Sequence, residues 1–506
     1  MTRVVACWFA LIMFAGIASG AVWYVPDDFA TIQEAIDSAS VVNGDTVAVR
    51  AGTYTENINF EGKSITLIGE EGAKATTIDG GQLGSVVVFN SGESGGSVLE
   101  GFTITNGTGN YDYLFYAIAG GGIYCKDSAP KIKDCLIIDN EADFGGGVFG
   151  GSPSMSGCVV NNNEATWGGG FFCYEGKPII SENSFKGNVA YYGGGAYCFF
   201  KLDEFGVMSA NTFTSNSAFY GGGLYCFGST SLIFNNTIYQ NTANTRGGGV
   251  FLLSGTATVT NNNIVGNTAG VAGGGISCRQ GTTATVINSI IYSNSAPTGP
   301  QISLEANSMP ALLSINYSDV SGGQANVHVD ANCILEWGVG MIDDNPLFAD
   351  SANGDFHLTY PSPCRDTGFY TGSIPATDPD GDPRKSLVTT DIGVDEYYFH
   401  LFIDGNLVPG GNATFTIVGA PTQDVILALG GGVRNKAFNT PYGDLWLDTP
   451  ITQYPLGTID STGIYTFSTN LPGSWVSGDE HPFQALCGAV GSAGTTLTNL
   501  EILVVE

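Results

Sequence analysis

Short apolar runs separated by glycine and asparagine form a repeating pattern along most of this chain. Between residues 120 and 296 each repeat carries a Gly-Gly-Gly triplet, short runs of Val, Ile, Phe and Tyr, and an Asn-x-Ala element. The period is 23 to 28 residues, and the asparagines are Asn140, Asn163, Asn188, Asn216, Asn241, Asn267 and Asn294. No repeat holds an apolar i, i+3, i+4, i+7 stripe long enough for a helix. The pattern therefore predicts a solenoid built of strands.

Each repeat has room for three short strands and three bends. We therefore predict an all-β fold, a parallel β-helix in which equivalent residues stack at about 4.8 Å. An asparagine at a bend tolerates the left-handed backbone conformation and can bond to its neighbours. The seven asparagines are thus predicted to form an internal amide ladder, and a row of ligands is the alternative.

Five cysteines share one position in the repeat, three residues after the glycine triplet: Cys125, Cys173, Cys198, Cys226 and Cys278. Cysteine packs as a small buried hydrophobe, so we predict an inward stack of reduced thiols. Neighbouring coils are close enough for a disulfide by distance, which remains the alternative. The chain has no CxxC motif of the kind that binds metal.

The N-terminal region predicts export. Residues 1–20 have a positive start at Arg3, an apolar core and a small-residue cleavage site, which is the pattern of a signal peptide. We expect an extracellular or bacterial cell-surface location. Residues 21–40 contain a strand and then a capping box from Thr31 to Glu34 that starts a short amphipathic helix. This segment is predicted to cap the first coil.

The rest of the chain divides in two. Residues 41–397 are predicted to be β-helix, with regular coils over 120–296. Residues 398–506 lose the repeat and show alternating strands, which predict a β-sandwich.

The net negative charge of the chain excludes several classes of binding partner. The chain has 17 basic and 47 acidic side chains, giving −30, or −31 once Arg3 is removed. Such a surface repels nucleic acid and anionic lipid, and it repels acidic polysaccharides unless calcium bridges them. No stretch after the signal reaches the length of a transmembrane helix. The expected partner is a polysaccharide or a cell-surface glycan.

Several motifs resemble known families. Tyr24-Val-Pro, Thr31-Ile-Gln-Glu-Ala-Ile36 and Gly52-Thr-Tyr54 resemble the first coils of the pectin-lyase-like superfamily, whose fold is a right-handed parallel β-helix. The glycine-rich repeats are similar to polymorphic-outer-membrane-type repeats of bacteria. The stretch 362–397, with Asp391-Ile-Gly-Val394, resembles the choice-of-anchor Q module that closes exported bacterial β-helices.

The resemblance identifies a fold rather than a reaction. The Asn-Thr-Asp, Gly-His-Gly and Arg-Ile-Lys motifs of galacturonan hydrolases are absent, as are the Gln-Asp-Thr-Leu of pectin methylesterases and the Trp-Ile-Asp-His of pectate lyases. A lyase would need an arginine or lysine base near calcium-binding carboxylates. Arg246 and Arg279, each beside a triplet, and Asp143 are the catalytic candidates.

Two further patterns suggest ligands. Asp378, Asp380 and Asp382 alternate around a glycine as in a short calcium loop, with a plain turn as the alternative. The residue before the triplet is aromatic in four successive repeats and then arginine: Phe144, Trp167, Tyr192, Tyr220 and Arg246. If this column faces outward, it is a platform for stacking sugar rings. If it faces inward, it is part of the core.

The leading hypothesis is a secreted or surface protein that binds carbohydrate along its solenoid. A polysaccharide lyase or hydrolase is the first alternative. A structural or adhesive surface protein is the second.

Overall fold

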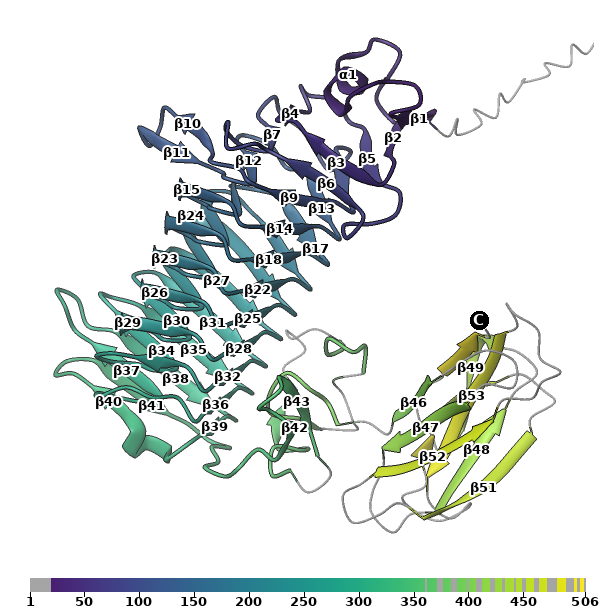
Figure 1. Ribbon diagram of the computed structural model, residues 1–506. Coiled ribbons are helices and arrows are strands. Elements are labelled where there is room, and N and C mark those ends of the chain that lie inside the picture. Colours follow the sequence, from purple (N-terminus) through teal and green to yellow (C-terminus); the bar gives the residue numbers. More distant parts are fainter. Residues whose placement is uncertain are drawn as a thin grey trace, which may run out of the picture. The chain divides into compact units, whose positions relative to one another are not determined.

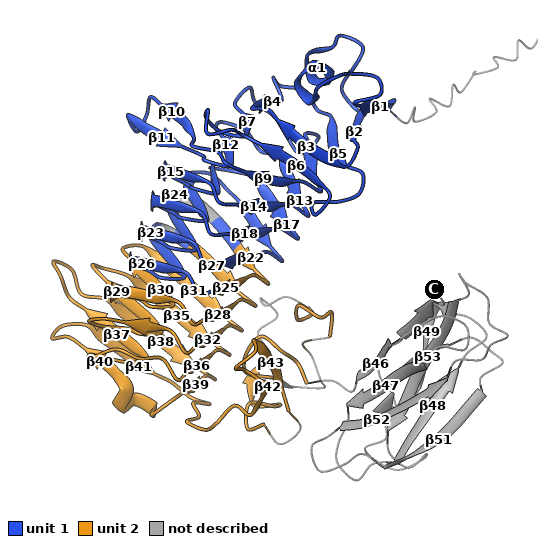
Figure 2. Ribbon diagram, viewed as in Figure 1, with its two compact units in different colours: residues 1–207, 214–230 blue, residues 208–213, 231–506 orange. Residues whose placement is uncertain are grey.

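The computed structural model describes residues 20–359, 362–370, 376–382, 384 and 389–397, and the backbone of the strands between 400 and 504 (Figure 1). At 200–205, 229 and 389 it describes the backbone alone. The predicted signal peptide lies outside the described residues, except for Gly20. The chain forms two compact units, residues 1–207 with 214–230 and residues 208–213 with 231–506 (Figure 2).

Unit 1 begins with strand β1 (Val22–Val25) and helix α1 (Ile32–Asp37), so the predicted helix is present. The Thr31 side chain accepts a hydrogen bond from the Glu34 backbone N–H, and the Glu34 carboxylate accepts one from Ala30 N–H. The first bond is the Thr31 half of a capping box, whereas the Glu34 carboxylate bonds one residue before the N-cap. The apolar face of the helix is buried, while its role as a cap stays a prediction.

Unit 1 is a stack of parallel coils, and four columns of short strands run along it. The first is β4 (Ile58–Asn59), β7 (Val87–Phe89), β12 (Ile123–Cys125), β16 (Val148–Gly150), β20 (Phe171–Tyr174) and β24 (Ala196–Ser209). The second is β1, β2 (Thr46–Val49), β5 (Thr66–Gly69), β8 (Val98–Glu100), β13 (Lys131–Lys133), β17 (Ser154–Ser156) and β21 (Ile179–Ser181).

The other two columns of unit 1 complete each coil. The third is β3 (Gly52–Thr55), β6 (Thr76–Asp79), β9 (Thr103–Thr105), β14 (Leu136–Ile138), β18 (Val159–Asn161) and β22 (Ser184–Lys186). The fourth is β11 (Ala117–Ala119), β15 (Glu141–Phe144), β19 (Glu164–Trp167), β23 (Val189–Tyr192) and β26 (Ser217–Tyr220). One hairpin departs from the pattern, because β10 (Asn110–Asp112) pairs with β11 antiparallel.

Unit 2 continues the same coil plan. Its first column is β30 (Val250–Leu253), β34 (Ile276–Arg279), β37 (Ile302–Glu305) and β40 (Val327–Val329), and its second is β31 (Thr256–Thr260), β35 (Thr283–Ile287), β38 (Leu312–Asn316) and β41 (Ile334–Trp337). The third column is β28 (Thr237–Tyr239), β32 (Asn263–Val265), β36 (Ile290–Tyr292) and β39 (Asp319–Val320). The fourth is β29 (Thr242–Arg246) with β33 (Thr268–Ala269). Strands β25 (Thr212–Thr214) and β27 (Leu224–Phe234) each include residues of both units, and the 3₁₀ turn η1 (Gly323–Asn326) belongs to unit 2. The parallel β-helix predicted from the repeat is confirmed.

The predicted asparagine ladder is present in each unit. In unit 1 the side-chain Nδ2 of Asn140 donates to Asn163 Oδ1 at 3.0 Å, Asn163 to Asn188 at 3.1 Å, and Asn188 to Asn216 at 3.0 Å. In unit 2 Asn241 donates to Asn267, and Asn267 to Asn294. All are buried, so each coil places the amide in the core and satisfies it there.

The ladder asparagines do not adopt the left-handed conformation themselves, contrary to the expectation. The residue before each of them has the positive φ, from 54° to 64° over Asp139, Asn162, Gly187, Ser215, Gln240, Gly266 and Ser293. The bend is made by this preceding residue, and the asparagine follows it with its side chain turned inward. A second ladder, Asn211 to Asn236 to Asn262, lies five residues earlier in the coil.

The cysteines are buried, as predicted, and their thiols are not joined in disulfides: Cys125, Cys173, Cys198, Cys226 and Cys278. Cys173 lies directly opposite Cys198 in the parallel register, whereas Cys125 lies opposite Gly150 and Cys278 opposite Leu252, so the stack does not include all five. Burial raises the pKa of the Cys198 thiol well above its usual value, so the thiol stays protonated and unreactive. The disulfide alternative is excluded for these five residues.

After β41 the chain leaves the coils and packs against their side within unit 2. Strands β42 (Phe348–Asp350) and β43 (Asp355–Leu358) form a hairpin, and β44 (Gly368–Phe369) pairs with β45 (Thr389–Thr390). Leu358, Cys364 and Ile392 form an apolar cluster with Ile290 of β36. We call residues 343–397 the lateral segment. Figure 1 shows β42 and β43 beside β36 and β39.

The C-terminal region contains antiparallel strands, as its alternating pattern predicted. β46 (His400–Gly405), β47 (Asn412–Val418) and β52 (Ile464–Asn470) form one sheet. A second contains β48 (Asp424–Leu429), β51 (Thr452–Thr458), β53 (Glu480–Cys487), β54 (Thr496–Leu497) and β55 (Glu501–Val504), and β49 (Val433–Thr440) pairs with β50 (Gly443–Leu447). That these sheets form a sandwich stays a prediction.

Candidate functional site

The four aromatic residues before the glycine triplets form one continuous column in unit 1. Their ring centroids are 6.0 Å apart from Phe144 to Trp167, 4.0 Å from Trp167 to Tyr192, and 5.7 Å from Tyr192 to Tyr220. All four side chains are half-buried, so the column lies on the surface rather than in the core. Arg246, the fifth predicted ligand-binding residue, belongs to unit 2.

The rings of this column stack on one another. Their planes differ by 11°, 22° and 6° along the series, so each ring uses its faces to contact the next coil. Solvent therefore meets ring edges, including the Trp167 indole and the tyrosine rings. A sugar that packs on a ring face needs another place on this surface.

A second aromatic column lies behind the first. Tyr124, Phe149, Phe172, Tyr197 and Tyr225 stack at 4.7 to 5.6 Å and are almost fully buried. The two columns meet edge to face, for example Trp167 against Tyr197 at 5.2 Å and 88°. The glycine triplet permits this contact, because a Cβ on Gly168 would lie 2.3 Å from the Phe171 carbonyl oxygen.

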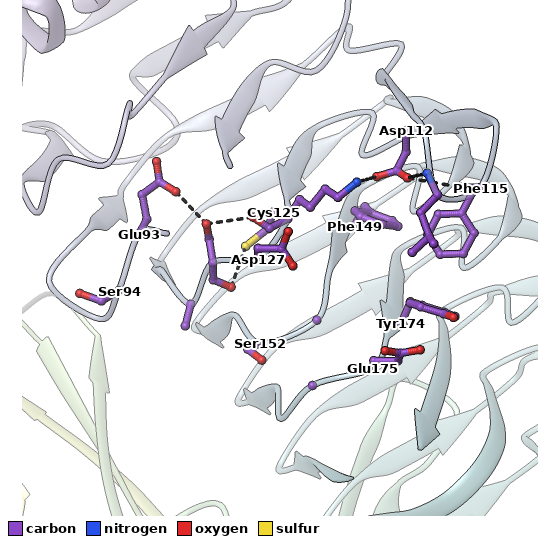
Figure 3. A pocket seen from close by; sticks show the side chains of 16 residues that line it. Glu93, Ser94, Asp112, Phe115, Cys125, Asp127, Phe149, Ser152, Tyr174 and Glu175 are labelled. Carbon is purple, nitrogen blue, oxygen red and sulfur yellow. Dashed lines mark hydrogen bonds and ion pairs between the residues drawn. The ribbon is translucent and has the colours of Figure 1, made fainter. Parts of the chain in front are cut away.

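The β10–β11 hairpin covers the start of both columns. Phe115, between its two strands, contacts Phe144 at 4.7 Å and Tyr174 at 4.8 Å. Beneath the hairpin is a pocket of about 370 Å³ (Figure 3). Its apolar lining includes Phe115, Phe149 and Tyr174, and its polar lining includes Glu93, Asp112, Lys126, Asp127 and Glu175.

Tyr174 contributes an aromatic ring to the lining of this pocket. Its ring stacks on Phe199 of the following coil at 5.1 Å and 8°. The register of β16 with β20 places Gly151 beside it in the preceding coil, where no side chain stands. Both residues line the pocket. Glycine is needed there, since a Cβ on Gly151 would lie 2.7 Å from the Glu175 carbonyl oxygen.

Two buried carboxylates give the pocket fixed negative charge. Asp112 accepts hydrogen bonds from the Tyr124 hydroxyl at 2.6 Å and from Lys126 Nζ at 2.9 Å. Burial opposes ionisation, yet these bonds hold the pKa of Asp112 below its usual value. Glu93 accepts from the Ser128 hydroxyl at 2.7 Å and from two backbone N–H groups, and its pKa is lowered in the same way against burial.

The structure places the catalytic candidates apart from this pocket. Asp143 is exposed in unit 1, and its carboxylate accepts a hydrogen bond from Ile118 N–H at 2.9 Å, which holds the hairpin. In unit 2 the Nε of Arg246 lies 2.8 Å from Glu305, and that of Arg279 lies 3.4 Å from it. Both arginines therefore balance one buried carboxylate.

The three aspartates proposed as a calcium loop have separate roles. Asp378 is buried, and its carboxylate accepts hydrogen bonds from the backbone N–H groups of Asp380, Asp382 and Glu396. This arrangement is that of a turn. Asp380 instead points to His357, 3.0 Å away.

Sequence reasoning missed the pocket residues. Phe115 and Tyr174 lie outside the column that the triplets define. Two features of the sequence mark this region. The repeat is interrupted at residues 108–119, and Gly150 and Gly151 stand at the repeat positions that Cys173 and Tyr174 occupy in the next coil.

A buried aspartate on β39 should make the stability of unit 2 depend on pH. Burial raises the pKa of Asp319 to about 7, so the folded chain holds a proton that the unfolded chain has lost. We expect the thermal midpoint to fall as pH rises from about 4 to 7. Asp319→Asn should flatten this slope, and the exposed Asp350→Asn should not. Equal slopes for the wild type and Asp319→Asn would contradict the assignment.

Comparison with known families agrees with the coils described above. Residues 40–242 match a family described as right handed beta helix region, so this stretch is similar to that family and the fold is a right-handed parallel β-helix. No significant match was found among curated proteins. Within the described residues, no helix is long and apolar enough to cross a membrane. The resemblances to polymorphic-outer-membrane-type repeats and to the choice-of-anchor Q module stay predictions.

Proposed function

We propose that this chain is an exported, extracellular or cell-surface protein that binds neutral carbohydrate in the pocket beneath the β10–β11 hairpin. The observation that carries the proposal is the Tyr174 ring beside Gly151, in a cavity that also holds carboxylates and a lysine. Sugar sites combine an aromatic surface for the apolar face of the ring with charged groups for its hydroxyls.

The size and the contacts of the pocket suit a small part of a glycan. Its volume of about 370 Å³ falls in the range of about 300–1,000 Å³ typical of small-ligand sites. Phe115 closes one side with its ring perpendicular to that of Tyr174. Lys126 can donate to a hydroxyl while Asp127 and Glu175 accept from others.

The charge of the pocket favours a neutral ligand. Glu93 and Asp112 are held ionised inside it, and the whole chain carries −30. An acidic sugar would enter against this field. A neutral polysaccharide can continue from the pocket along the first aromatic column, because Phe115 contacts both Tyr174 and Phe144.

We expect Tyr174→Ala to weaken glycan binding roughly tenfold or more, because the stacking surface is removed. The measurement is binding of the full chain to a panel of neutral and acidic polysaccharides, with and without calcium. Tyr113→Ala is the matched control, since Tyr113 is exposed on the same hairpin but does not line the pocket. Trp167→Ala in the same assay tests whether the ligand extends along the column.

Two results would contradict the proposal. The first is no binding to any neutral polysaccharide of the panel. The second is equal affinity of wild type and Tyr174→Ala. Release of unsaturated sugars, scored in the same samples, would favour the lyase alternative.

A further inference from the structure

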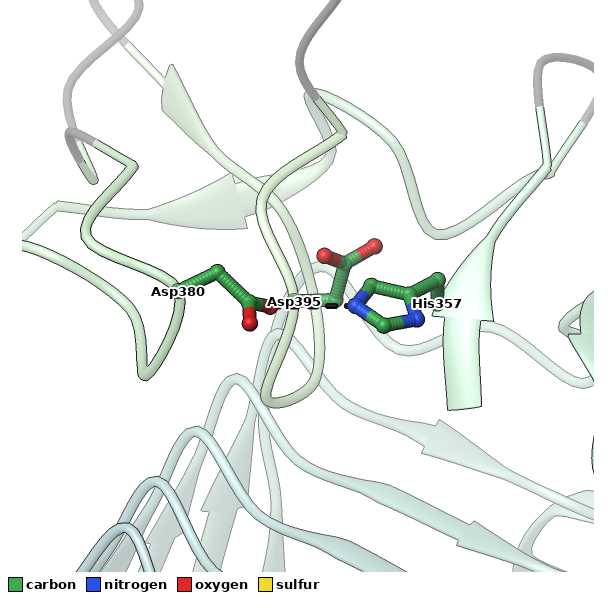
Figure 4. Close-up of side chains that lie close together, drawn as sticks. All are labelled: His357, Asp380 and Asp395. Atoms are coloured by element: carbon green, nitrogen blue, oxygen red, sulfur yellow. Dashed lines mark hydrogen bonds and ion pairs between the residues drawn. The ribbon is translucent and has the colours of Figure 1, made fainter. Parts of the chain in front are cut away.

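Three polar side chains from separate parts of the lateral segment converge in unit 2 (Figure 4). His357 belongs to β43, Asp380 to the turn 376–382, and Asp395 to the stretch 389–397. One nitrogen of the histidine and one oxygen of each carboxylate all lie within 4.8 Å of one another. The distance from His357 Nε2 to Asp380 Oδ2 is 3.0 Å.

The surroundings fix the orientation of this group. Asp355 Oδ1 lies 2.5 Å from His357 Nδ1, so this nitrogen donates to Asp355 and Nε2 faces the two other carboxylates. An imidazole with one nitrogen bonded to a carboxylate and the other turned to a ligand position is the usual arrangement at metal sites. Leu358 N–H donates to Asp395 Oδ2 at 2.6 Å, and Asp380 N–H donates to Asp378 at 3.0 Å.

A cavity of about 220 Å³ adjoins the group, and a second observation points to a ligand there. His357, Asp380 and Asp395 line the cavity together with Asn263 of β32. Asn263 is fully buried, and its side-chain Nδ2 has no hydrogen-bond partner, while its Oδ1 accepts from Val394 N–H. A buried amide donor without a partner is costly, so a ligand in the cavity would satisfy it.

We propose that His357, Asp380 and Asp395 bind a divalent cation of the zinc and manganese class. One imidazole nitrogen and two carboxylate oxygens form the mixed donor set that such ions accept, whereas calcium takes oxygen ligands. His357 and Asp380 are about half exposed, so an ion can reach both side chains from solvent. The remaining coordination positions face the cavity, where a water or anion on the cation would accept from Asn263.

This site differs from the calcium loop suggested by the sequence. Only Asp380 is common to both, because Asp378 is occupied by backbone N–H groups. A bound cation would join β43, the turn 376–382 and the stretch 389–397. It would therefore stabilise the folded lateral segment as well as present an exchangeable coordination position.

The test uses the full chain without a polyhistidine tag, freed of metal with a chelator and titrated calorimetrically with Zn²⁺, Mn²⁺ and Ca²⁺. We expect saturable binding of one Zn²⁺ or Mn²⁺, a rise in the thermal midpoint, and much weaker binding of Ca²⁺. His357→Ala and Asp380→Asn should each abolish the saturable binding. Asp355→Ala, which removes the acceptor and frees the imidazole to rotate, should weaken it about 10- to 100-fold.

His328→Ala is the matched control. His328 lies on β40, pairs with Asp330 at 2.9 Å and is not part of the group. This variant should bind the metal as the wild type does. Uptake that survives in both His357→Ala and Asp380→Asn would assign the metal to other residues and overturn the proposal. So would the absence of saturable uptake, or a preference for Ca²⁺.

Discussion

Replacing Arg384 by methionine is expected to lower the free energy of unfolding by about 3–5 kcal/mol. Arg384 is fully buried in the lateral segment. Its guanidinium donates to Glu396 Oε1 at 2.8 Å, to Asn235 Oδ1 at 2.8 Å and to the carbonyl oxygens of Gly393 and Val394. The substitution removes the charged partner of Glu396, which keeps only the Thr390 hydroxyl and Asp391 N–H as donors, and it removes one donor from each of the three other acceptors.

Measuring this loss of stability at two pH values distinguishes the loss of the charge interaction with Glu396 from the loss of side-chain packing. Burial raises the pKa of Glu396 to about 8 although Arg384 lowers it, so the carboxyl group is protonated at pH 6 and needs the guanidinium most at a pH above 8. The loss in Arg384→Met should therefore be larger at pH 8.5 than at pH 6. Arg50→Met is the control, because Arg50 makes exposed ion pairs with Asp27 and Glu70 and its removal should cost far less. A loss in Arg384→Met that is independent of pH would indicate packing alone.

Replacing Asn188 by leucine is the second large change, with an expected cost of about 3–5 kcal/mol from several unsatisfied groups together. Asn188 is a central member of the unit 1 ladder. Its Oδ1 accepts from the backbone N–H and the Nδ2 of Asn163, and its Nδ2 donates to Val160 O and to Asn216 Oδ1. Leucine has the same branching and number of side-chain heavy atoms as asparagine and a somewhat larger volume, so lost hydrogen bonds rather than a cavity would cause the loss.

The same substitution on the surface provides the control. Asn90 is exposed in unit 1, so Asn90→Leu should change the midpoint of chemical denaturation little. Hydrogen exchange should show the Asn188→Leu effect first at the Asn163 backbone amide, whose acceptor is removed. An unchanged midpoint for Asn188→Leu would show that the ladder contributes nothing to stability.

The sequence predicts the repeating features well because each is a column. Any residue that recurs at one offset must stack when coils stack, so the ladder, the thiols and the aromatic column all follow from the period. The period does not say whether a stacked ring exposes its face or its edge to solvent. Ring planes of Phe144 and Trp167 lie nearly parallel, and only the structure shows that their edges face outward.

The remaining parts of the candidate sites come from segments without a period. Phe115 reaches the columns through a hairpin inserted between two coils. His357, Asp380 and Asp395 are brought together by the packing of the lateral segment on the coils, and no spacing links them in the sequence. The period also cannot say which residue of the bend is left-handed, because the asparagine and the residue before it, Asp139 in the first coil, recur with the same period.

The hydrogen bonds of the asparagine ladder all run in one direction along the coils. This direction determines how such chains can gain or lose length. Within each unit the amides donate toward the next coil. In unit 1 the Oδ1 of the first member, Asn140, accepts from Gly107 N–H, and in unit 2 the Nδ2 of the last member, Asn294, donates to Gln301 Oε1. The inner members are interchangeable, whereas the two ends are specific. Duplication or loss of one whole repeat inside a unit leaves the neighbouring amides paired, so evolution can lengthen or shorten each series by entire coils, while a change by part of a coil breaks the series.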